Sequence, residues 1–143
     1  MARVVKVRRD VQAVIFDESD GEKKVLLVKK PDFSAQRHRW RLLKGGVESG
    51  ETETEALKRE ILEELGLKNV QIMGKLHSYK FVFRGTNHFV SSYLVKADSQ
   101  EPITLQKSEV ADYVWALKEK AIQKLFWNNE KEAVRRLKAG LPR

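Results

Sequence analysis

Three glutamates lie close together in the sequence, at Glu60, Glu63 and Glu64. Because an α-helix turns by about 100° per residue, their carboxylates would share one helix face. Like charges three and four residues apart cost about 0.2–0.5 kcal/mol per pair in an isolated helix, which favours a cation over them. Carboxylate oxygens suit Mg²⁺ or Mn²⁺, and Mg²⁺ usually binds through one or two carboxylates together with waters and substrate phosphates. The spacing therefore indicates a site for a hard divalent cation.

The residues before the glutamates predict a tight loop that runs into a helix. The glycines at 45–46 permit backbone torsions barred to other residues and let the chain approach a ligand closely. Thr52 can cap the helix, and Glu55, three residues later, completes a capping box. These signals predict a helix over about 53–65, closed by Gly66 in the left-handed conformation.

One edge of the predicted helix is apolar, since Leu57, Ile61 and Leu65 lie in the sector beside the glutamates. This edge would hold the helix against a core and keep the acidic edge at the rim. Arg59 is one turn before Glu63 and can fix the direction of its carboxylate, as metal sites usually require. Taken alone, the helix could equally be a solvated amphipathic helix of a charged protein.

The loop and the helix together resemble the Nudix box, the signature of the Nudix hydrolase family. All nine specified positions are present between residues 45 and 67, at the spacing of the box. The resemblance implies a single Nudix domain over residues 1–143. The matching residues are Gly45, Glu51, Arg59, Glu60, Ile61, Glu63, Glu64, Gly66 and Leu67.

The rest of the chain carries strand and helix patterns. Apolar, β-rich runs predict strands at 11–16, 25–28, 70–76, 78–83, 88–95 and 110–115, and residues 37–44 predict one short basic strand. Helical spacing from Leu117 onwards predicts terminal helices with a break near 128–129. Strands around one central helix, with helices at the end, imply an α/β fold in which helices cover both faces of a mixed sheet. The family resemblance implies the same α/β/α sandwich, with a loop–helix–loop box.

Composition narrows the class of protein. A chain of 143 residues without cysteine predicts one domain with no disulfide frame, thiol nucleophile or thiolate metal site. The sequence has no apolar run of 18 residues and no signal-peptide core, which predicts a soluble, cytoplasmic protein without a membrane partner. A net charge of +8 favours polyanionic partners such as nucleotides or RNA, although solubility or heat adaptation would also explain it.

The resemblance assigns roles to the residues of the box. Family members hydrolyse a nucleoside diphosphate linked to another group, by attack of water on phosphorus. The cofactor implied is Mg²⁺, with Mn²⁺ as the alternative, held by Glu60, Glu63, Glu64 and a backbone carbonyl of the glycine turn, taken as Gly45. Glu51 and Arg59 correspond to positions that chiefly orient these ligands.

Residues outside the box are candidates for substrate binding and for the general base. Lys44 fits the place where many relatives keep a lysine that faces the phosphates, although a leucine precedes it where many carry proline. Arg41 brings further positive charge towards the glycine loop, and Tyr79 could stack on a base. The general base would be either Glu60 or, by its position in a distal loop, Glu109.

Several substrates agree with this sequence. The basic charge and the aromatic strand after His77 look most like relatives that cleave dinucleoside polyphosphates or trim the 5′ end of RNA, and we expect a dinucleoside polyphosphate of the diadenosine tetraphosphate type. A (d)NTP pyrophosphatase resembling MutT is the alternative, because the tyrosine that many dinucleotide hydrolases carry further along is not obvious. A non-catalytic nucleotide or RNA sensor with the same fold belongs to another class, but such members usually lose glutamates of the box. The sequence leaves the oligomeric state open.

Overall fold

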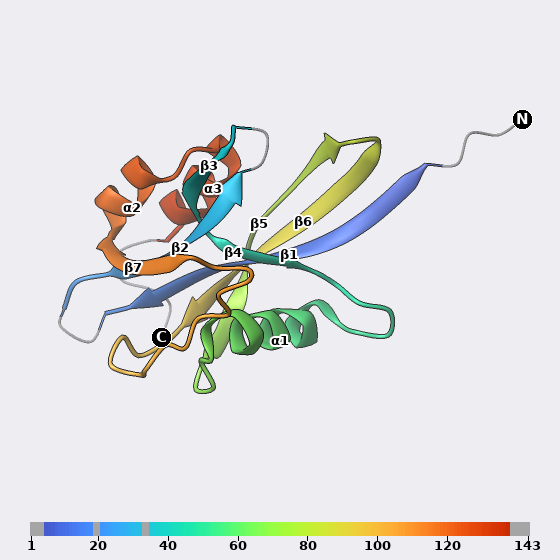
Figure 1. Ribbon diagram of the computed structural model, residues 1–143. Coiled ribbons are helices and arrows are strands. Elements are labelled where there is room, and N and C mark those ends of the chain that lie inside the picture. The colour runs from blue at the N-terminus through green and yellow to red at the C-terminus, as the bar shows by residue number, and fades with distance from the viewer. Residues whose placement is uncertain (1–4, 19–20, 33–34, 138–143) are drawn as a thin grey trace, which may run out of the picture.

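The computed structural model describes residues 5–18, 21–32 and 35–137 (Figure 1). Its strands are β1 Lys6–Asp17, β2 Lys24–Asp32, β3 Arg37–Arg41, β4 Leu43–Gly46, β5 Gln71–Phe83, β6 Thr86–Lys96 and β7 Asp112–Leu117. Its helices are α1 Glu53–Leu65, α2 Lys118–Lys124 and α3 Asn128–Arg135. No helix in these described ranges is long and apolar enough to cross a membrane.

The strands of the described residues form one mixed sheet of seven strands, with β1 at its centre. The main path runs β3-β2-β1-β6-β5, while β4 pairs with β1 and β7 pairs with β2. Strands β1 and β6 are parallel, and the other pairs are antiparallel. The continuous apolar run at 11–16 suits this position, since a central strand is buried on both faces.

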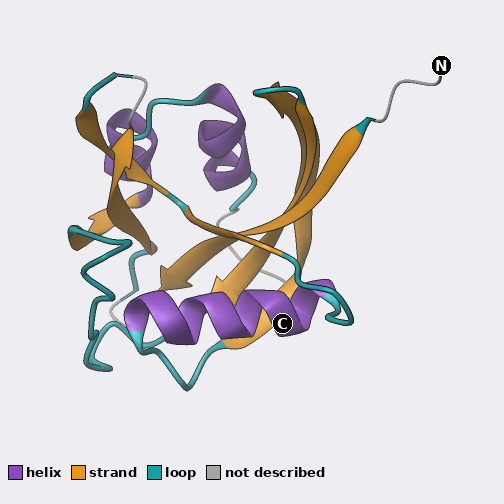
Figure 2. Ribbon diagram, turned by 45° about the vertical axis from the view of Figure 1, so that its right-hand side comes forward, coloured by secondary structure: helices purple, strands orange, loops and turns teal. Residues whose placement is uncertain are grey.

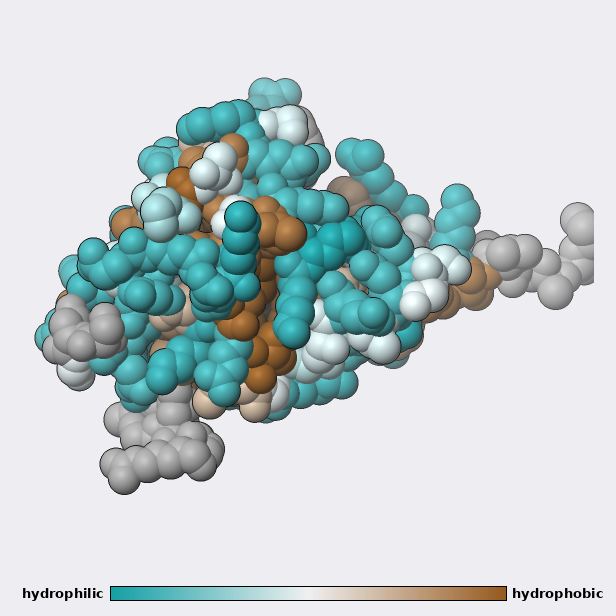
Figure 3. All heavy atoms as spheres, turned by 90° about the horizontal axis from the view of Figure 1, so that it is seen from below, coloured by the Kyte–Doolittle hydropathy of each residue, from teal (hydrophilic) through white to brown (hydrophobic). Residues whose placement is uncertain are grey.

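Helices cover both faces of the sheet, as Figures 1 and 2 show, with α1 on one side and α2 and α3 on the other. Val11, Ala13 and Ile15 of β1 pack with α1, whereas Val14 and Phe16 pack with the residues of α2 and α3. The predicted α/β/α sandwich is therefore confirmed. Figure 3 looks onto the α1 side, where hydrophilic residues cover most of the surface and apolar residues gather in a narrow strip.

The basic segment at 37–44 was predicted as one strand, and this prediction is wrong. The segment divides at Leu42 into β3, which pairs with β2, and β4, which pairs with β1. Leu42 and Leu43 are both buried but belong to the hydrophobic clusters on opposite faces of the sheet. The chain thus changes partner between two consecutive core residues, which a period-two pattern does not reveal.

The runs at 70–76 and 78–83 were predicted as separate strands, but they form the single strand β5. It pairs with β6 along its whole length, with irregularities between Ile72 and Gly74 and between Lys75 and His77. Such bulges interrupt the alternation of a strand without ending its pairing.

The helix boundaries agree closely with the sequence signals, whereas β7 is shifted. Helix α1 begins and ends as predicted. The break between α2 and α3 falls at residues 125–127, just before the expected place. Strand β7 begins two residues later than predicted, because Val110 is buried in the α1 cluster as part of a loop.

Candidate active site

Helix α1, which carries the glutamates, is fixed at both ends by local contacts. Thr52 Oγ1 accepts a hydrogen bond from the Glu55 backbone N–H at 3.2 Å, and Glu55 Oε1 accepts one from the Thr52 N–H at 2.9 Å. This pair is the predicted capping box, and Gly66 closes the helix with a φ of 70°. The glutamates between these caps therefore have defined directions.

Gly45 of β4 lies directly against the carboxyl group of Glu60. A Cβ at position 45 would overlap Cδ and Oε1 of Glu60. Leu57, Ile61 and Leu65 are fully buried on the core side of the helix, so α1 cannot move away without losing that packing. The close approach of helix and strand thus requires glycine here.

Arg59 ties the loop of the box to the helix. Its Nε and Nη2 donate to the two carboxylate oxygens of Glu51 at 2.7 and 2.9 Å, and Nη2 also donates to the Gly46 carbonyl at 2.9 Å. Nη1 donates to Glu60 Oε1 at 2.9 Å and reaches Glu63 Oε2 at 3.4 Å. The Arg59 hydrogen bond lowers the pKa of Glu51 to about 2, and the same bond raises the pKa of Arg59. Arg59 therefore holds loop and carboxylates in one arrangement.

Glu64 is a buried carboxylate beside a second acidic group. Its side chain is only 5% exposed, and its Oε1 lies 2.8 Å from Lys30 Nζ of β2 without a well-oriented hydrogen bond. Burial, against the opposing charge of Lys30 and with a further contribution from the neighbouring Glu60, raises the pKa of Glu64 to about 7. A group that is hard to ionise in this way is stabilised as a carboxylate by an additional cation.

These features fit a divalent cation. Glu60 and Glu64 offer hard oxygen ligands, one oxygen of Glu64 is buried without a hydrogen bond, and Gly45 leaves its backbone open beside Glu60. Glu63 is 49% exposed and turns towards Arg59. Within the described ranges, no group of three or more acidic or histidine side chains converges on one point. Glu63 would therefore have to leave Arg59 to join the other two ligands.

Strand β4 separates these carboxylates from a second set of polar residues. Leu43 packs in the α1 cluster and Gly45 faces Glu60, so alternation directs Lys44 to the opposite face. Lys44 pairs with Gln12 of β1, whose amide donates to Glu130 of α3. The predicted lysine thus lies on the side of the sheet that the terminal helices cover. We call this side the cleft face, and its polar residues include Gln12, Arg41, Lys44, Tyr79 and Glu130.

Lys44 belongs to a charged cluster around the buried Asp10. Its Nζ lies 3.8 Å from Asp10 Oδ2 and 4.7 Å from the centre of the Phe81 ring. Asp10 also accepts a hydrogen bond from Arg8 Nε at 2.6 Å and contacts His88 Nδ1 at 2.9 Å. Burial lowers the pKa of Lys44, and Asp10 opposes that shift. Arg8 and Lys44 together bring positive charge to the glycine strand.

Arg41 is held by a carboxylate from α3. Its Nη2 and Nε donate to Glu130 Oε2 at 3.1 and 3.3 Å, and its guanidinium lies 4.3 Å from the ring centre of Trp127. The same Glu130 oxygen accepts a hydrogen bond from Gln12 Nε2 at 3.1 Å. Burial raises the pKa of Glu130, while Arg41 lowers it.

Tyr79 stands in a row of rings on the cleft face. Ring centres are 5.6 Å apart for His77 and Tyr79, 6.3 Å for Tyr79 and Phe81, and 4.6 Å for Phe81 and His88. Tyr79 Oη donates to Gln12 Oε1 at 3.4 Å, and burial raises the pKa of Tyr79. The rings form an aromatic wall beside the cations, as a nucleotide site requires.

Glu109 lies in the loop that packs on the C-terminal end of α1. The Gln106 backbone N–H donates to the Glu64 carbonyl at 3.0 Å, and the Ala111 N–H donates to the Lys29 carbonyl at 2.9 Å. This loop therefore borders the pair of Lys30 and Glu64. The Glu109 side chain itself is exposed, so the structure brings its loop, rather than its carboxylate, to the candidate site.

Three residues that the sequence did not single out are Lys30, Asp10 and Glu130. No local pattern connects Lys30 or Asp10 with the box. Glu130 did leave a signal, because it stands three and four residues before Ala133 and Val134, on the apolar face of α3. A carboxylate on such a face usually has a buried partner.

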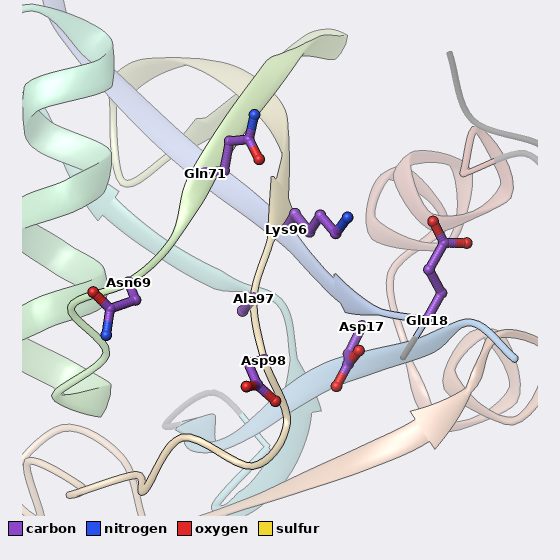
Figure 4. Close-up of a pocket in the computed structure, with 7 residues that line it drawn as sticks. All are labelled: Asp17, Glu18, Asn69, Gln71, Lys96, Ala97 and Asp98. Carbon is purple, nitrogen blue, oxygen red and sulfur yellow. The ribbon is translucent and has the colours of Figure 1, made fainter. Parts of the chain in front are cut away.

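A cavity of about 390 Å³ lies away from this site, at the ends of β1 and β6 (Figure 4). None of its lining residues belongs to the box or to the cleft face. They are Asp17, Glu18, Asn69, Gln71, Lys96, Ala97 and Asp98.

The chain is similar to proteins of one family. The model of the NUDIX domain matches residues 6–137. An RNA pyrophosphohydrolase of Sulfurovum sp. (strain NBC37-1) is 31% identical over 117 residues, which cover 74% of this chain and 73% of that protein. An oxidized purine nucleoside triphosphate hydrolase of Danio rerio is 35% identical over 88 residues, covering 61% of this chain and 54% of that protein.

Solved structures share the fold. An Ap4A hydrolase of C. elegans in a binary complex has a TM-score of 0.79 at 22% identity, with 90% of this chain and 93% of that chain covered. The ORF135 protein of E. coli has a TM-score of 0.74 at 27% identity, with 92% and 88% covered. At this identity, the first of these likenesses concerns the fold alone.

Proposed function

We propose that this chain, which belongs to the Nudix hydrolase family and is a pyrophosphohydrolase, acts on a dinucleoside polyphosphate such as diadenosine tetraphosphate. It would cleave a phosphoric anhydride bond of that substrate. The observation that carries the proposal is the division of the site by β4. Carboxylates lie on its α1 side, and cations with an aromatic wall lie on its cleft face. A molecule that contacts both sides would place a base against the aromatic wall of the cleft face. Its polyphosphate would then cross the edge of β4 to reach the carboxylates of the α1 side.

We assign the metal ligands to Glu60, Glu63, Glu64 and the carbonyl of Gly45, which would hold Mg²⁺ or Mn²⁺. When bound, such an ion supplies charge neutralisation at phosphate oxygens and orients the attacking water. Arg59 supports these ligands, because it donates hydrogen bonds both to Glu51 of the loop and to Glu60 of the helix and so joins the two. The observations that support this assignment are the buried Glu64 oxygen without a hydrogen bond and the close approach of Gly45 to Glu60.

The cleft face would bind the nucleoside and the first phosphates. Lys44 and Arg8 offer cationic groups beside Gly46, and a Cβ at position 46 would contact Arg8 Nη2. Arg41 and Tyr79 flank the floor formed by β1. Cations at this place attract polyphosphate, and rings stack on bases with about 1–3 kcal/mol per base.

The proton of the attacking water has two candidate acceptors. Glu60 contacts Gly45 and Arg59 at the centre of the site. Glu109 lies in a loop that borders Glu64 and would have to turn inwards to reach the water. Replacing each by glutamine and comparing the pH profiles of kcat distinguishes them, since the loss of the base removes the acidic limb of the profile.

A second candidate substrate is the 5′ end of triphosphorylated RNA. The relative that is named an RNA pyrophosphohydrolase matches over 74% of this chain. A net charge of +8 also suits a polyanion longer than a dinucleotide.

One experiment tests both candidates. Diadenosine tetraphosphate, dNTPs, ADP-ribose and 5′-triphosphate RNA are incubated with the protein and Mg²⁺ in ¹⁸O-labelled water, and the products are identified by mass. We expect cleavage of the dinucleotide with the label in one of the two products, which identifies the phosphorus attacked. If all four remain intact with Mg²⁺ or Mn²⁺, the proposed function is wrong. Selective cleavage of the RNA would replace the first candidate by the second.

A further inference from the structure

Glu130 is a buried carboxylate that no part of the Nudix box requires. It lies in the first turn of α3, is 1% exposed and shares a helix face with Ala133 and Val134. Its Oε2 accepts the hydrogen bonds from Arg41 and Gln12, whereas its Oε1 is buried without a well-oriented hydrogen bond in the described part of the chain, although the Leu42 backbone N–H also acts on this carboxylate and opposes the rise of its pKa that burial causes. Burying a carboxylate costs desolvation free energy, which the groups that it holds must offset.

The contacts of Glu130 join the two walls of the cleft face. On one side it holds Arg41 at the end of β3, next to Trp127. On the other side it holds Gln12 of β1, whose Oε1 accepts the hydrogen bonds of Ser92 Oγ at 2.8 Å and Tyr79 Oη at 3.4 Å. A continuous chain of hydrogen bonds therefore runs from β3 through α3 and β1 to β5.

This chain of bonds fixes the direction of Arg41. Two of its nitrogens, Nε and Nη2, point at one oxygen of Glu130, and Trp127 covers one face of the guanidinium. The Arg41 side chain is still 25% exposed, so part of the group remains available to a ligand. An arginine that is already oriented loses less side-chain entropy when it binds an anion.

We propose that Glu130 is the positioning residue of the substrate site, holding Arg41 directly and Tyr79 through Gln12 in the orientation that binds the nucleoside polyphosphate. The proposal rests on the function proposed above. It assigns Glu130 to binding rather than to the chemical step, because its partners lie on the cleft face and not among the carboxylates of α1.

The first test compares two substitutions on one helix. In Glu130→Gln the buried charge is lost, while in the control Glu132→Gln a carboxylate that is 41% exposed and pairs with Arg136 of the same helix end is changed in the same way. With diadenosine tetraphosphate as the probe, we expect KM to rise about tenfold in Glu130→Gln and kcat to stay within about twofold. The control should match the unmodified protein in both constants.

A double-mutant cycle with Arg41→Ala separates positioning from a general structural role. Because Glu130 acts on Arg41 directly, Glu130→Gln should raise KM less in the Arg41→Ala background than alone, the remaining rise passing through Gln12 and Tyr79. An equal rise of KM in both backgrounds, or a loss of kcat at constant KM, would overturn the proposal.

Gln12→Met is the second variant, in case Glu130→Gln does not fold. We expect it to raise KM, because it releases Tyr79 and removes one of the donors to Glu130, and an unchanged KM in a folded Gln12→Met protein also contradicts the proposal.

A measurement without substrate keeps this inference distinct from the proposed function. In ¹⁵N NMR spectra of the whole chain, the Arg41 Nε–H signal should exchange slowly with water in the unmodified protein and in Glu132→Gln, and quickly in Glu130→Gln. If no substrate of the panel is cleaved but this pattern is seen, the function is wrong and the positioning is right. If the Arg41 signal is the same in all three proteins, the positioning is wrong whatever the activity.

Discussion

The two sides of β4 differ in how the chain builds them. On the α1 side, the loop, the helix, Gly45, Arg59 and the glutamates all come from 23 consecutive residues. On the cleft face, the polar residues come from β1, β3, β4, β5, β6 and α3, and the bond from Gln12 to Glu130 spans 118 residues. The proposed metal ligands are therefore close together in the sequence, whereas the residues proposed to bind the substrate are brought together by the fold.

The two sides also differ in their balance of charge. Acidic groups dominate the α1 side, where Lys30 and Arg59 contact Glu64 and Glu60. Cations dominate the cleft face, where the buried Asp10 and Glu130 hold Arg8, Lys44 and Arg41 in place. A polyphosphate would meet cations of the protein on one side and a metal ion on the other. If this comparison is right, substitutions on the α1 side should lower kcat and those on the cleft face should raise KM.

The largest effect is expected for Glu64→Gln. This change removes a proposed metal ligand but keeps the shape of a group that is already poorly ionised, so turnover should fall by about 10³-fold or more while the fold remains. Steady-state kinetics with Mg²⁺ and thermal unfolding measure the two effects. Glu119→Gln, an exposed change in α2, is the control. Turnover close to that of the unmodified protein in Glu64→Gln would refute the ligand assignment.

Adjacent glycines of β4 allow the sharpest comparison of the two sides. In Gly45→Ala, the new methyl group overlaps the Glu60 carboxyl group, and we expect kcat to fall by about 10²-fold. In Gly46→Ala, the methyl group meets the far end of the flexible Arg8 side chain, so we expect a rise in KM of only a few-fold. Each variant serves as the control of the other. Equal effects on kcat would mean that β4 does not separate catalysis from binding.

Lys44→Met should have an intermediate effect on binding alone. The substitution keeps the length of the side chain but removes its charge, while Asp10 retains Arg8 and His88 as partners. We expect KM to rise about tenfold with little change in kcat, and the difference from the unmodified protein to shrink at high salt. Lys58→Met, an exposed change on α1, is the control. A fall in kcat with constant KM would assign Lys44 to the chemical step instead.

The smallest effect concerns the stability of the α1 side. Burial alone would raise the pKa of Glu53, but hydrogen bonds from Tyr93, Arg9 and Ser91 outweigh it and lower the pKa to about 2. Because the folded pKa lies below the usual value of 4.5, this stabilisation is fully present above pH 4.5 and is lost as the pH falls towards 2. We estimate it at about 1–2 kcal/mol.

Urea unfolding at pH 7 and pH 3 measures the contribution of Glu53. In Glu53→Gln, the free energy of unfolding should fall less between these two pH values than in the unmodified protein, because the titrating group is gone. Tyr93→Phe should show part of the same effect, since it removes one of the donors. An identical pH dependence in all three proteins would contradict the role of Glu53.

The sequence predicted the elements whose signals are local. The capping box, Gly66 and the apolar period of 57, 61 and 65 were sufficient for both ends of α1. The continuous apolar run at 11–16 was sufficient for a strand, whereas its central place in the sheet came only from the structure. The segment at 37–44 was mispredicted because the choice between β2 and β1 as partner depends on the packing of both faces, and β5 because a bulge looks like a strand end.

The sequence by itself determined the helix that carries the glutamates, both of its ends and the family to which the chain belongs, since these depend on residues within a few turns of one another. Only the tertiary structure decided that Lys30 meets Glu64, that Lys44 turns to the cleft face and that Glu130 holds Arg41 across 89 residues. Hydrogen bonds and ion pairs over such separations form only after the sheet has brought distant strands together, and no local pattern records them. For this reason 23 consecutive residues are enough to recognise the family, whereas the residues proposed to bind the substrate come from the whole fold.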